Sequence, residues 1–192
     1  IPQGVTIRLA GDYEDQQETF GKMGLLAALI ILLVYIVMAS QFESFIKPFV
    51  IMFTIPFALS GVIMALWMTG RSLDMIGAFG LIMLVGIVVK NGIVLIDYID
   101  LLRERGIELN KAIVMAGKSR MRPVLMTAFT TILGMVPMAM SSGEGSEMWQ
   151  PMGVVVIGGL LVSTLLTFFM VPTLYAAVSR QTIETADKVV DK

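Results

Sequence analysis

Long uncharged stretches of apolar residues dominate the chain, and short polar segments separate them. A helix needs roughly 20 consecutive apolar residues to cross about 30 Å of hydrocarbon, so each stretch predicts a membrane-spanning helix. One stretch is interrupted only by Lys90. The pattern predicts an all-α membrane protein with a five-helix transmembrane bundle, whose spans cover about 23–42, 48–70, 75–97, 123–143 and 151–179.

The residues before the first span have a different pattern. Apolar Val5, Ile7 and Leu9 alternate with polar residues, as in a half-buried strand, and the acidic stretch "GDYEDQQETF" follows. We expect residues 1–21 to be the end of a domain outside the membrane. The chain begins with Ile1 and not with methionine, and we therefore expect it to be a fragment of a longer protein.

Two further polar segments lie between and after the spans. Asn110 is a candidate N-cap for a short amphipathic helix over about 110–120, which we expect to lie along the cytoplasmic face. Residues 181–192 are polar and predict a cytoplasmic tail. Glycines inside the spans predict small helix faces that allow close packing; they are Gly77, Gly80, Gly86, Gly92, Gly153, Gly158 and Gly159.

The basic residues predict how the chain is oriented. Short cytoplasmic loops are enriched in lysine and arginine. The segment between the third and fourth spans is the most basic, with Arg103, Arg105, Lys111, Lys118, Arg120 and Arg122. This segment is therefore expected inside, which places the N-terminus outside and the C-terminus in the cytoplasm.

Composition excludes several classes of function. The chain is 56% hydrophobic and 15% charged, and its net charge of −1 offers no basic surface for nucleic acid. It has no cysteine and no histidine, which removes disulfides, thiolate metal sites and the usual general base. The 16 methionines are scattered through the apolar stretches, which disfavours a copper path. We predict no cofactor, no bound metal and no enzymatic turnover.

Lys90 is the candidate functional residue of the third span. A charge near the middle of a bilayer costs several kcal/mol, so it is kept where it is partnered or used. Asp97 lies on nearly the same helix face, but seven residues separate the two by roughly 10 Å, beyond ion-pair reach. The other spans contain no carboxylate, so the counter-ion is expected outside this chain. The structural alternative is that Lys90 bonds backbone carbonyls or points into a wet cavity.

The fourth span supplies a second candidate at the same depth. Thr127 follows Arg120 by seven residues, as Lys90 precedes Asp97 by seven, and the two helices run in opposite directions. Lys90 and Thr127 are thus placed to share a hydrogen-bond network. The alternative for a membrane threonine is a bond to its own helix, which we expect for Thr130 and Thr131. Asn91 is open to a similar alternative, since an amide also joins helices.

Four stretches carry a resemblance to a known family. These are "SLDMIGAFGLIMLVGIVVKNGIVLIDYI", "AGKSRMRPVLMTAFTTILGMVPMAM", "SSGEGSEMWQPMGVVVIGGL" and "FFMVPTLY". They closely resemble the C-terminal membrane half of RND (resistance, nodulation and division) efflux permeases. The similarity covers about residues 1–180, and the lysine-asparagine and arginine-proline motifs occur in order and at the right spacing.

The resemblance implies a role for each candidate residue. Lys90 matches the family's relay lysine, Thr127 its relay threonine, and Arg120 the arginine near the cytoplasmic end of the proton path. Asn91 and Asp97 match the same motifs, with less defined roles. The five spans correspond to the eighth to twelfth of twelve, residues 1–21 to the end of the second periplasmic α/β domain, and the counter-ion to an aspartate pair in the fourth span.

The resemblance also implies an activity and partners. The motifs are more similar to the hydrophobe and amphiphile drug exporters than to the heavy-metal branch, so we expect proton-driven export of amphiphilic small molecules across the bacterial inner membrane. The expected partners are the lipid bilayer, the N-terminal half of the same protomer, two further copies in a homotrimer, a periplasmic adaptor and an outer-membrane channel.

Three other functions remain alternatives. A sterol- or lipid-sensing protein uses a similar bundle but does not require lysine and threonine at matched depth. A protein-export accessory has a similar bundle with half as many spans per chain, but the two motifs resemble the drug-exporter pattern more closely. An intramembrane protease needs paired aspartates, or a serine with histidine, within the membrane. The absence of histidine and the position of Asp97 near an interface disfavour the protease.

Overall fold

A computed structural model describes residues 12–143 and 145–190, together with the side chains of 19–143 and 145–179. Every regular element in these residues is helical. The elements are α1 (Asp12–Phe42), α2 (Ile46–Met52), α3 (Thr54–Thr69), α4 (Met75–Glu104), α5 (Leu109–Ala139), the 3-10 turn η1 (Ser146–Met148) and α6 (Gln150–Val190). The strand expected around Val5 lies outside the described residues.

The described residues contain five segments that are long and apolar enough to cross a membrane. They are Thr19–Phe42, Ile46–Thr69, Met75–Glu104, Leu109–Ala139 and Ser146–Ser179. The second of these comprises α2 and α3, which are separated only at Phe53. The predicted all-α bundle of five spans is confirmed, and the third span, α4, extends past its expected end at Asp97 to Glu104.

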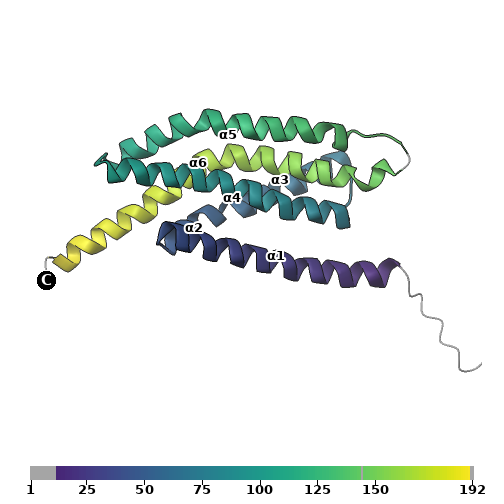
Figure 1. Ribbon diagram of the computed structural model, residues 1–192, viewed down its shortest axis with the longest axis horizontal. Helices are drawn as coiled ribbons and strands as arrows, with labels where there is room; N and C mark the ends of the chain where they lie inside the picture. Colours follow the sequence, from purple (N-terminus) through teal and green to yellow (C-terminus); the bar gives the residue numbers. More distant parts are fainter. Residues whose placement is uncertain (1–11, 144, 191–192) are drawn as a thin grey trace, which may run out of the picture.

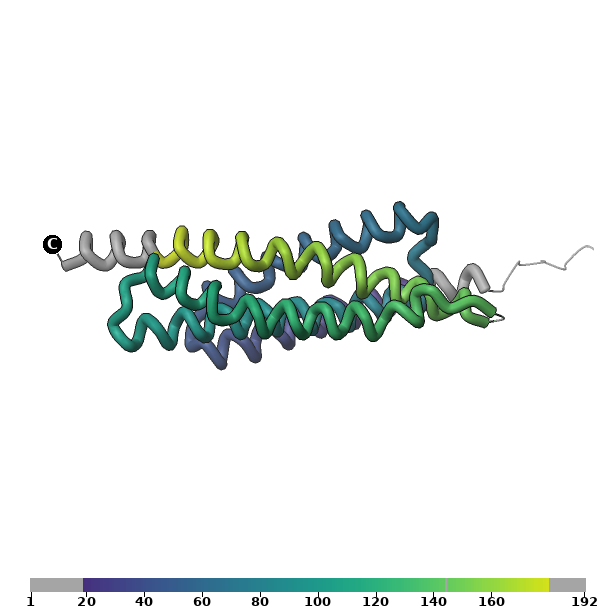
Figure 2. The backbone as a smooth tube through the Cα atoms, turned by 90° about the horizontal axis from the view of Figure 1, so that it is seen from above, coloured from purple at the N-terminus to yellow at the C-terminus, as the bar shows by residue number. Residues whose placement is uncertain are grey.

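The helices run side by side along the long axis of the molecule (Figures 1 and 2). α6 is the central helix, because it makes the most extensive contacts of the fold with α3, α4 and α5. α1 lies at the edge of the bundle, where it contacts α2 and α4. Most of the described side chains of α1, those of residues 19–42, are accordingly exposed.

Glycines set the distance between α6 and its neighbours. A Cβ atom added to Gly61 of α3 would lie 2.6 Å from the carbonyl oxygen of Gly158, and one added to Gly159 would overlap Leu84 of α4. The helices therefore approach so closely that no side chain fits between them. The predicted packing role is confirmed for Gly77, Gly80, Gly92, Gly153, Gly158 and Gly159. It is not found for Gly86, where an added Cβ meets nothing within 4 Å.

The amphipathic segment over 110–120 is not a separate helix, contrary to the prediction. It forms the first turns of α5, and Glu108 occupies the N-cap position that we predicted for Asn110. Ala112 and Ala116 are fully buried in the same hydrophobic cluster as Leu102 of α4. The segment is thus held against protein, and α5 continues through Pro123.

The expected cytoplasmic tail over 181–192 stays a prediction. α6 continues without a break to Val190, so most of this segment is helical.

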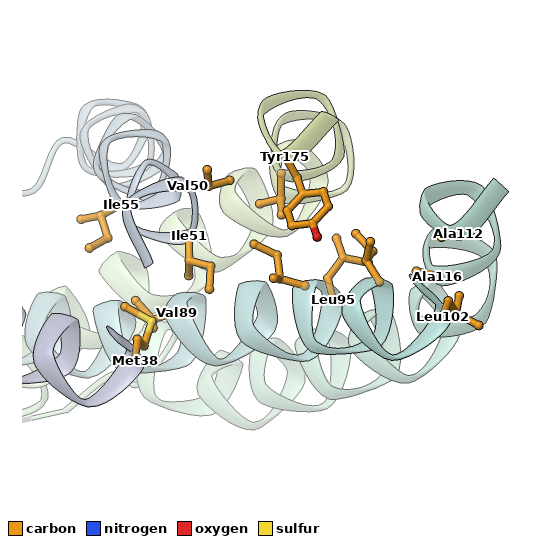
Figure 3. Close-up of a cluster of buried hydrophobic side chains, with 13 residues drawn as sticks. Met38, Val50, Ile51, Ile55, Val89, Leu95, Leu102, Ala112, Ala116 and Tyr175 are labelled. Carbon is orange, nitrogen blue, oxygen red and sulfur yellow. The ribbon is translucent and has the colours of Figure 1, made fainter. Parts of the chain in front are cut away.

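Two hydrophobic clusters form the core. The first, which we call the α4 C-terminal cluster, is shown in Figure 3 and consists of Met38, Val50, Ile51, Ile55, Val89, Leu95, Ile96, Ile99, Leu102, Ala112, Ala116, Val171 and Tyr175. The second, the α4 N-terminal cluster, consists of Ala58, Val62, Leu84, Val88, Ala128, Val155 and Leu160. Both clusters include α3, α4, α5 or its first turns, and α6, so α4 is fixed along most of its length.

Candidate functional site

α4 has one buried face and one exposed face. Leu84, Val88 and Leu95 are almost inaccessible and follow the spacing of one helical face. Gly86, Lys90 and Asp97 lie on the opposite face and are exposed. The predicted relay lysine therefore lies on the face of α4 that the described helices leave uncovered.

Lys90 lies halfway along α4, and its side chain is exposed. The ion pairs within the described side chains join Lys47 to Asp100 and Lys111 to Glu108, and neither includes Lys90. Asp97 is exposed and forms no ion pair with Lys90, as expected from the roughly 10 Å rise over seven residues. No described carboxylate neutralises Lys90.

Thr127 is exposed on α5, and its hydroxyl donates to the carbonyl oxygen of Val124 at 2.9 Å. Thr130 and Thr131 donate to the carbonyl oxygens of Met126 and Thr127, as predicted. In this structure Thr127 has the same type of local bond. The predicted hydrogen-bond network between Thr127 and Lys90 is therefore not formed within the described chain.

Arg120 connects α5 to α4. Its guanidinium carbon lies 4.3 Å from the centroid of the Tyr98 ring, and its Nε atom is buried without a hydrogen-bond partner in the described chain. The contact places Arg120 at the depth of Tyr98, which is next to Asp97, as the sequence predicts. Lys90 and Thr127 lie eight and seven residues from the contact, so both are roughly 10–12 Å from it along antiparallel helices.

Asn91 is 8% exposed, and it shares the buried face of α4 with Leu84, Val88 and Leu95. Its side chain therefore points away from the uncovered face that carries Lys90. Of the predicted site residues, Lys90 and Asp97 share the exposed face of α4, whereas Asn91 belongs to the interior.

A polar cluster that the sequence did not reveal joins three helices near the end of α4. Lys47 of α2 forms an ion pair with Asp100 at 2.9 Å, and the Tyr175 hydroxyl of α6 donates to the other Asp100 oxygen at 2.6 Å. One turn further, Arg103 donates to the hydroxyl of Ser179 at 3.0 Å. The Asp100 side chain is only partly accessible, and its interactions with Lys47 and Tyr175 offset the free-energy cost of removing the carboxylate from water.

The chain is similar to known proteins along most of its length. The family model of the AcrB/AcrD/AcrF family matches residues 1–179. The cobalt-zinc-cadmium resistance protein CzcA of Cupriavidus metallidurans is 39% identical over 188 residues, which cover 97% of this chain and 18% of CzcA. The swarming motility protein SwrC of Bacillus subtilis is 38% identical over 180 residues, 93% of this chain and 17% of SwrC.

Two solved structures have a similar fold over most of this chain. A crystal structure described as a heavy metal efflux pump, crystal form II, superposes with a TM-score of 0.81 at 30% identity, and the match covers 93% of this chain and 18% of the pump. Crystal form I gives a TM-score of 0.80 at 32% identity, over 88% and 17%.

The fold and the matches define a multi-pass membrane protein of the RND efflux type. The chain belongs to the AcrB/AcrD/AcrF family. It spans less than a fifth of the length of the relatives that it matches. The prediction of the family is thereby confirmed, whereas the prediction of the drug-exporter branch is not.

Proposed function

We propose that this chain is the C-terminal membrane part of a proton-driven efflux permease of the bacterial inner membrane. The observation that carries the proposal is the position of Lys90, halfway along an apolar helix, exposed, and without a described carboxylate partner. A charge kept within a bilayer despite its cost is partnered or used in the intact protein.

The counter-ion belongs to the part of the protomer that this chain does not include. We infer an aspartate pair on a helix that covers the exposed face of α4. When these carboxylates are ionised, they hold the ammonium of Lys90; when they are protonated, the attraction is lost and the ammonium turns toward another partner, such as Thr127. The change in charge alters how α4 packs, and helix movement then drives export.

The other predicted residues have supporting roles in this cycle. Arg120 is held by Tyr98 near the end of the path that we assign to the cytoplasmic side. Asp97 lies on the same exposed face as Lys90 and offers a carboxylate between Lys90 and that end. Asn91 anchors the opposite face of α4 within the bundle.

The test is Lys90→Ala in the complete protein, reconstituted in vesicles with an imposed pH gradient. We expect proton-coupled export to be lost, while insertion and abundance remain normal. The matched control is Lys111→Ala, because the Lys111 side chain is 75% exposed and pairs only at the start of α5. Export at the unchanged rate in Lys90→Ala would exclude Lys90 as the relay residue.

The proposed function includes an orientation of the chain in the membrane, which the distribution of basic residues supports. The basic turn between α4 and α5 is expected in the cytoplasm, and the turns before α4 and before η1 are expected outside. This chain contains no cysteine, so single cysteines at Ser72, Ser142 and Ser119 in a complete protein freed of other cysteines report the topology. We expect a membrane-impermeant thiol reagent added from outside to label the first two positions and not the third.

Two classes of cargo have support. The motifs favour hydrophobic and amphiphilic molecules, whereas the names of CzcA and of the similar solved pump favour divalent metal ions. No group of metal-ligating side chains occurs among the described residues, and cargo recognition is therefore assigned to the remaining parts of the protein. Cells that express the complete protein should gain resistance either to lipophilic dyes and detergents or to Zn²⁺, Cd²⁺ and Co²⁺, and this difference decides between the two classes.

The proposed assembly is a homotrimer that works with a periplasmic adaptor and an outer-membrane channel, without enzymatic turnover. Native mass spectrometry of the complete protein in detergent tests the trimer. A monomer at every protein concentration would contradict this assembly while leaving the relay in place.

A further inference from the structure

Buried polar side chains gather in one zone of the bundle. Apart from Gln150 at the start of α6, the buried polar residues of the described chain are Thr54, Asn91, Ser163, Thr164 and Thr167. They come from α3, α4 and α6, and α6 packs extensively against both of the other helices. We call these five residues the polar layer.

The polar layer lies at the depth of Lys90. α4 and α6 run parallel. Asp100 of α4 accepts a hydrogen bond from Tyr175 of α6, and Leu84 of α4 lies against Gly159 of α6. In both contacts the residue numbers of the two partners differ by 75. The same offset places Asn91 level with a position between Thr164 and Thr167. Asn91 therefore lies within roughly 3 Å, along the helix axis, of the level of either threonine.

α3 contributes to the same layer. It runs antiparallel to α6, with Gly61 against Gly158 and Val162, so Thr54 falls near the level of Thr167. The layer thus lies where the α4 N-terminal and α4 C-terminal clusters meet. Among the described side chains, the buried polar residues inside the bundle lie near the depth of Lys90.

Thr164 differs from the other hydroxyl residues of the layer. Thr54, Ser163 and Thr167 donate to carbonyl oxygens of their own helices, those of Ile51, Leu160 and Ser163. The Thr164 side chain is 4% exposed, and its Oγ1 atom has no hydrogen-bond partner in the described chain. A valine fills the same volume without an unsatisfied hydroxyl, so packing alone does not account for threonine here.

We propose that Thr164 is a positioning residue of the proton relay and acts through Asn91. This inference rests on the proposed function. Lys90 and Asn91 are consecutive on α4 and therefore about 100° apart around its axis, the first exposed and the second buried, so a rotation of α4 that moves the ammonium also moves the carboxamide. In the arrangement described here the Thr164 hydroxyl is unpaired, and in the second arrangement it bonds the carboxamide of Asn91. This bond lowers the energy of the second arrangement relative to the first.

The test compares two buried threonines of α6 in the complete protein. Thr164→Val removes the unpaired hydroxyl, and Thr167→Val, the matched control, removes a hydroxyl that is bonded within its own helix. Each variant is assayed for melting temperature and for the pH dependence of proton-coupled export in vesicles. We expect Thr164→Val to melt at the same or a higher temperature, yet to export about three- to tenfold more slowly with a displaced pH profile, as one ordinary hydrogen bond allows.

Thr164→Ser retains the hydroxyl and is expected to export with the original pH profile. We expect the control Thr167→Val to keep the original pH profile too. If Thr164→Val fails to insert, Thr164→Ala takes its place with the same expectation. An unchanged rate and profile in the Thr164 variant, or the same displacement in Thr167→Val, would overturn the proposal. Lys90→Ala distinguishes failure of the proposed relay from failure of the role of Thr164. Normal export by Lys90→Ala would exclude the relay itself. If Lys90→Ala loses export but Thr164→Val exports normally, only the role of Thr164 is excluded.

Discussion

The guanidinium group of Arg120 lies over the ring of Tyr98, with its carbon 4.3 Å from the ring centroid. An arginine cation is attracted to the negative face of an aromatic ring, and the attraction is stronger where water is excluded. The buried Nε atom of Arg120 shows that part of the group is removed from solvent. The contact joins α5 to α4 at a single level and so determines which residues of the two helices lie at the same depth.

Replacing Tyr98 tests this contact. Tyr98→Phe keeps the aromatic face, and we expect it to retain the melting temperature of the complete protein. Tyr98→Leu removes the face and should destabilise the protein by about 1 kcal/mol, within the usual range of a partly desolvated cation–π contact. Melting curves in detergent measure the difference. Phe129→Leu is the control, since Phe129 is an exposed aromatic residue of the same bundle. Equal effects of the two Tyr98 variants would contradict a role for the ring.

The polar cluster around Asp100 gives a second prediction. Asp100→Ala leaves the Lys47 ammonium and the Tyr175 hydroxyl without their shared acceptor, and we expect a loss of about 1–3 kcal/mol in stability. The double variant Lys47→Met with Asp100→Ala should recover part of this loss, because no charge is then left unpaired.

The Lys111–Glu108 pair is the control for this experiment. Its side chains are 75% and 63% exposed, so Glu108→Gln should change the melting temperature little. Should Asp100→Ala be as mild as Glu108→Gln, the cluster would not hold α2, α4 and α6 together.

The spans and the position of Lys90 were predictable because both follow from local composition. An uncharged apolar stretch has one favourable arrangement in a bilayer, and a single lysine inside it is conspicuous. Most of the predicted close contacts at glycines were also found, because a glycine inside an apolar span is likewise visible in the local sequence. The close approach of Gly61 was not predicted, since it depends on which helix crosses α3.

Other features depend on contacts between distant residues. Nothing in the sequence near Asp100 indicates Lys47, which lies two spans earlier in the chain, or Tyr175, which follows Asp100 by 75 residues. The start of α5 was predicted as a separate amphipathic helix from its polar residues. Burial of Ala112 and Ala116 against α4 instead makes it part of a long helix, a tertiary effect that local pattern does not report.

The glycine contact between α3 and α6 gives a third prediction. A Cβ atom at Gly158 would overlap Ala65 and lie 2.9 Å from the carbonyl oxygen of Gly61, so Gly158→Ala must push two backbones apart. Overpacking of this kind costs about 1–3 kcal/mol. We expect a lower melting temperature for Gly158→Ala, and no decrease for Gly117→Ala on α5, where an added Cβ meets nothing within 4 Å. A stable Gly158→Ala variant would show that the helices are farther apart than described.

The uncovered face of α4 gives the last prediction, which concerns Gly86. Side chains of a helix lean toward its N-terminus, so the stem of Lys90 extends over the turn that contains Gly86. Apart from the adjacent residues and the backbone of its own helix, no described atom lies within 4 Å of a Cβ placed there, so Gly86 makes no close contact with another helix of this bundle. We expect it to leave room for the helix that carries the counter-ion of Lys90.

In the complete protein, Gly86→Ala should lower proton-coupled export, because the added methyl group keeps the acidic partner away from the ammonium. Alanine is a better helix former than glycine by up to about 1 kcal/mol, so a weaker α4 does not explain such a loss. Gly134→Ala is the matched control: Gly134 is also exposed within a helix and open around its Cβ position, and its substitution should leave export unchanged. Full export by both Gly86→Ala and the bulkier Gly86→Leu would mean that no helix packs closely against Lys90, and the ammonium would then require a partner of another kind.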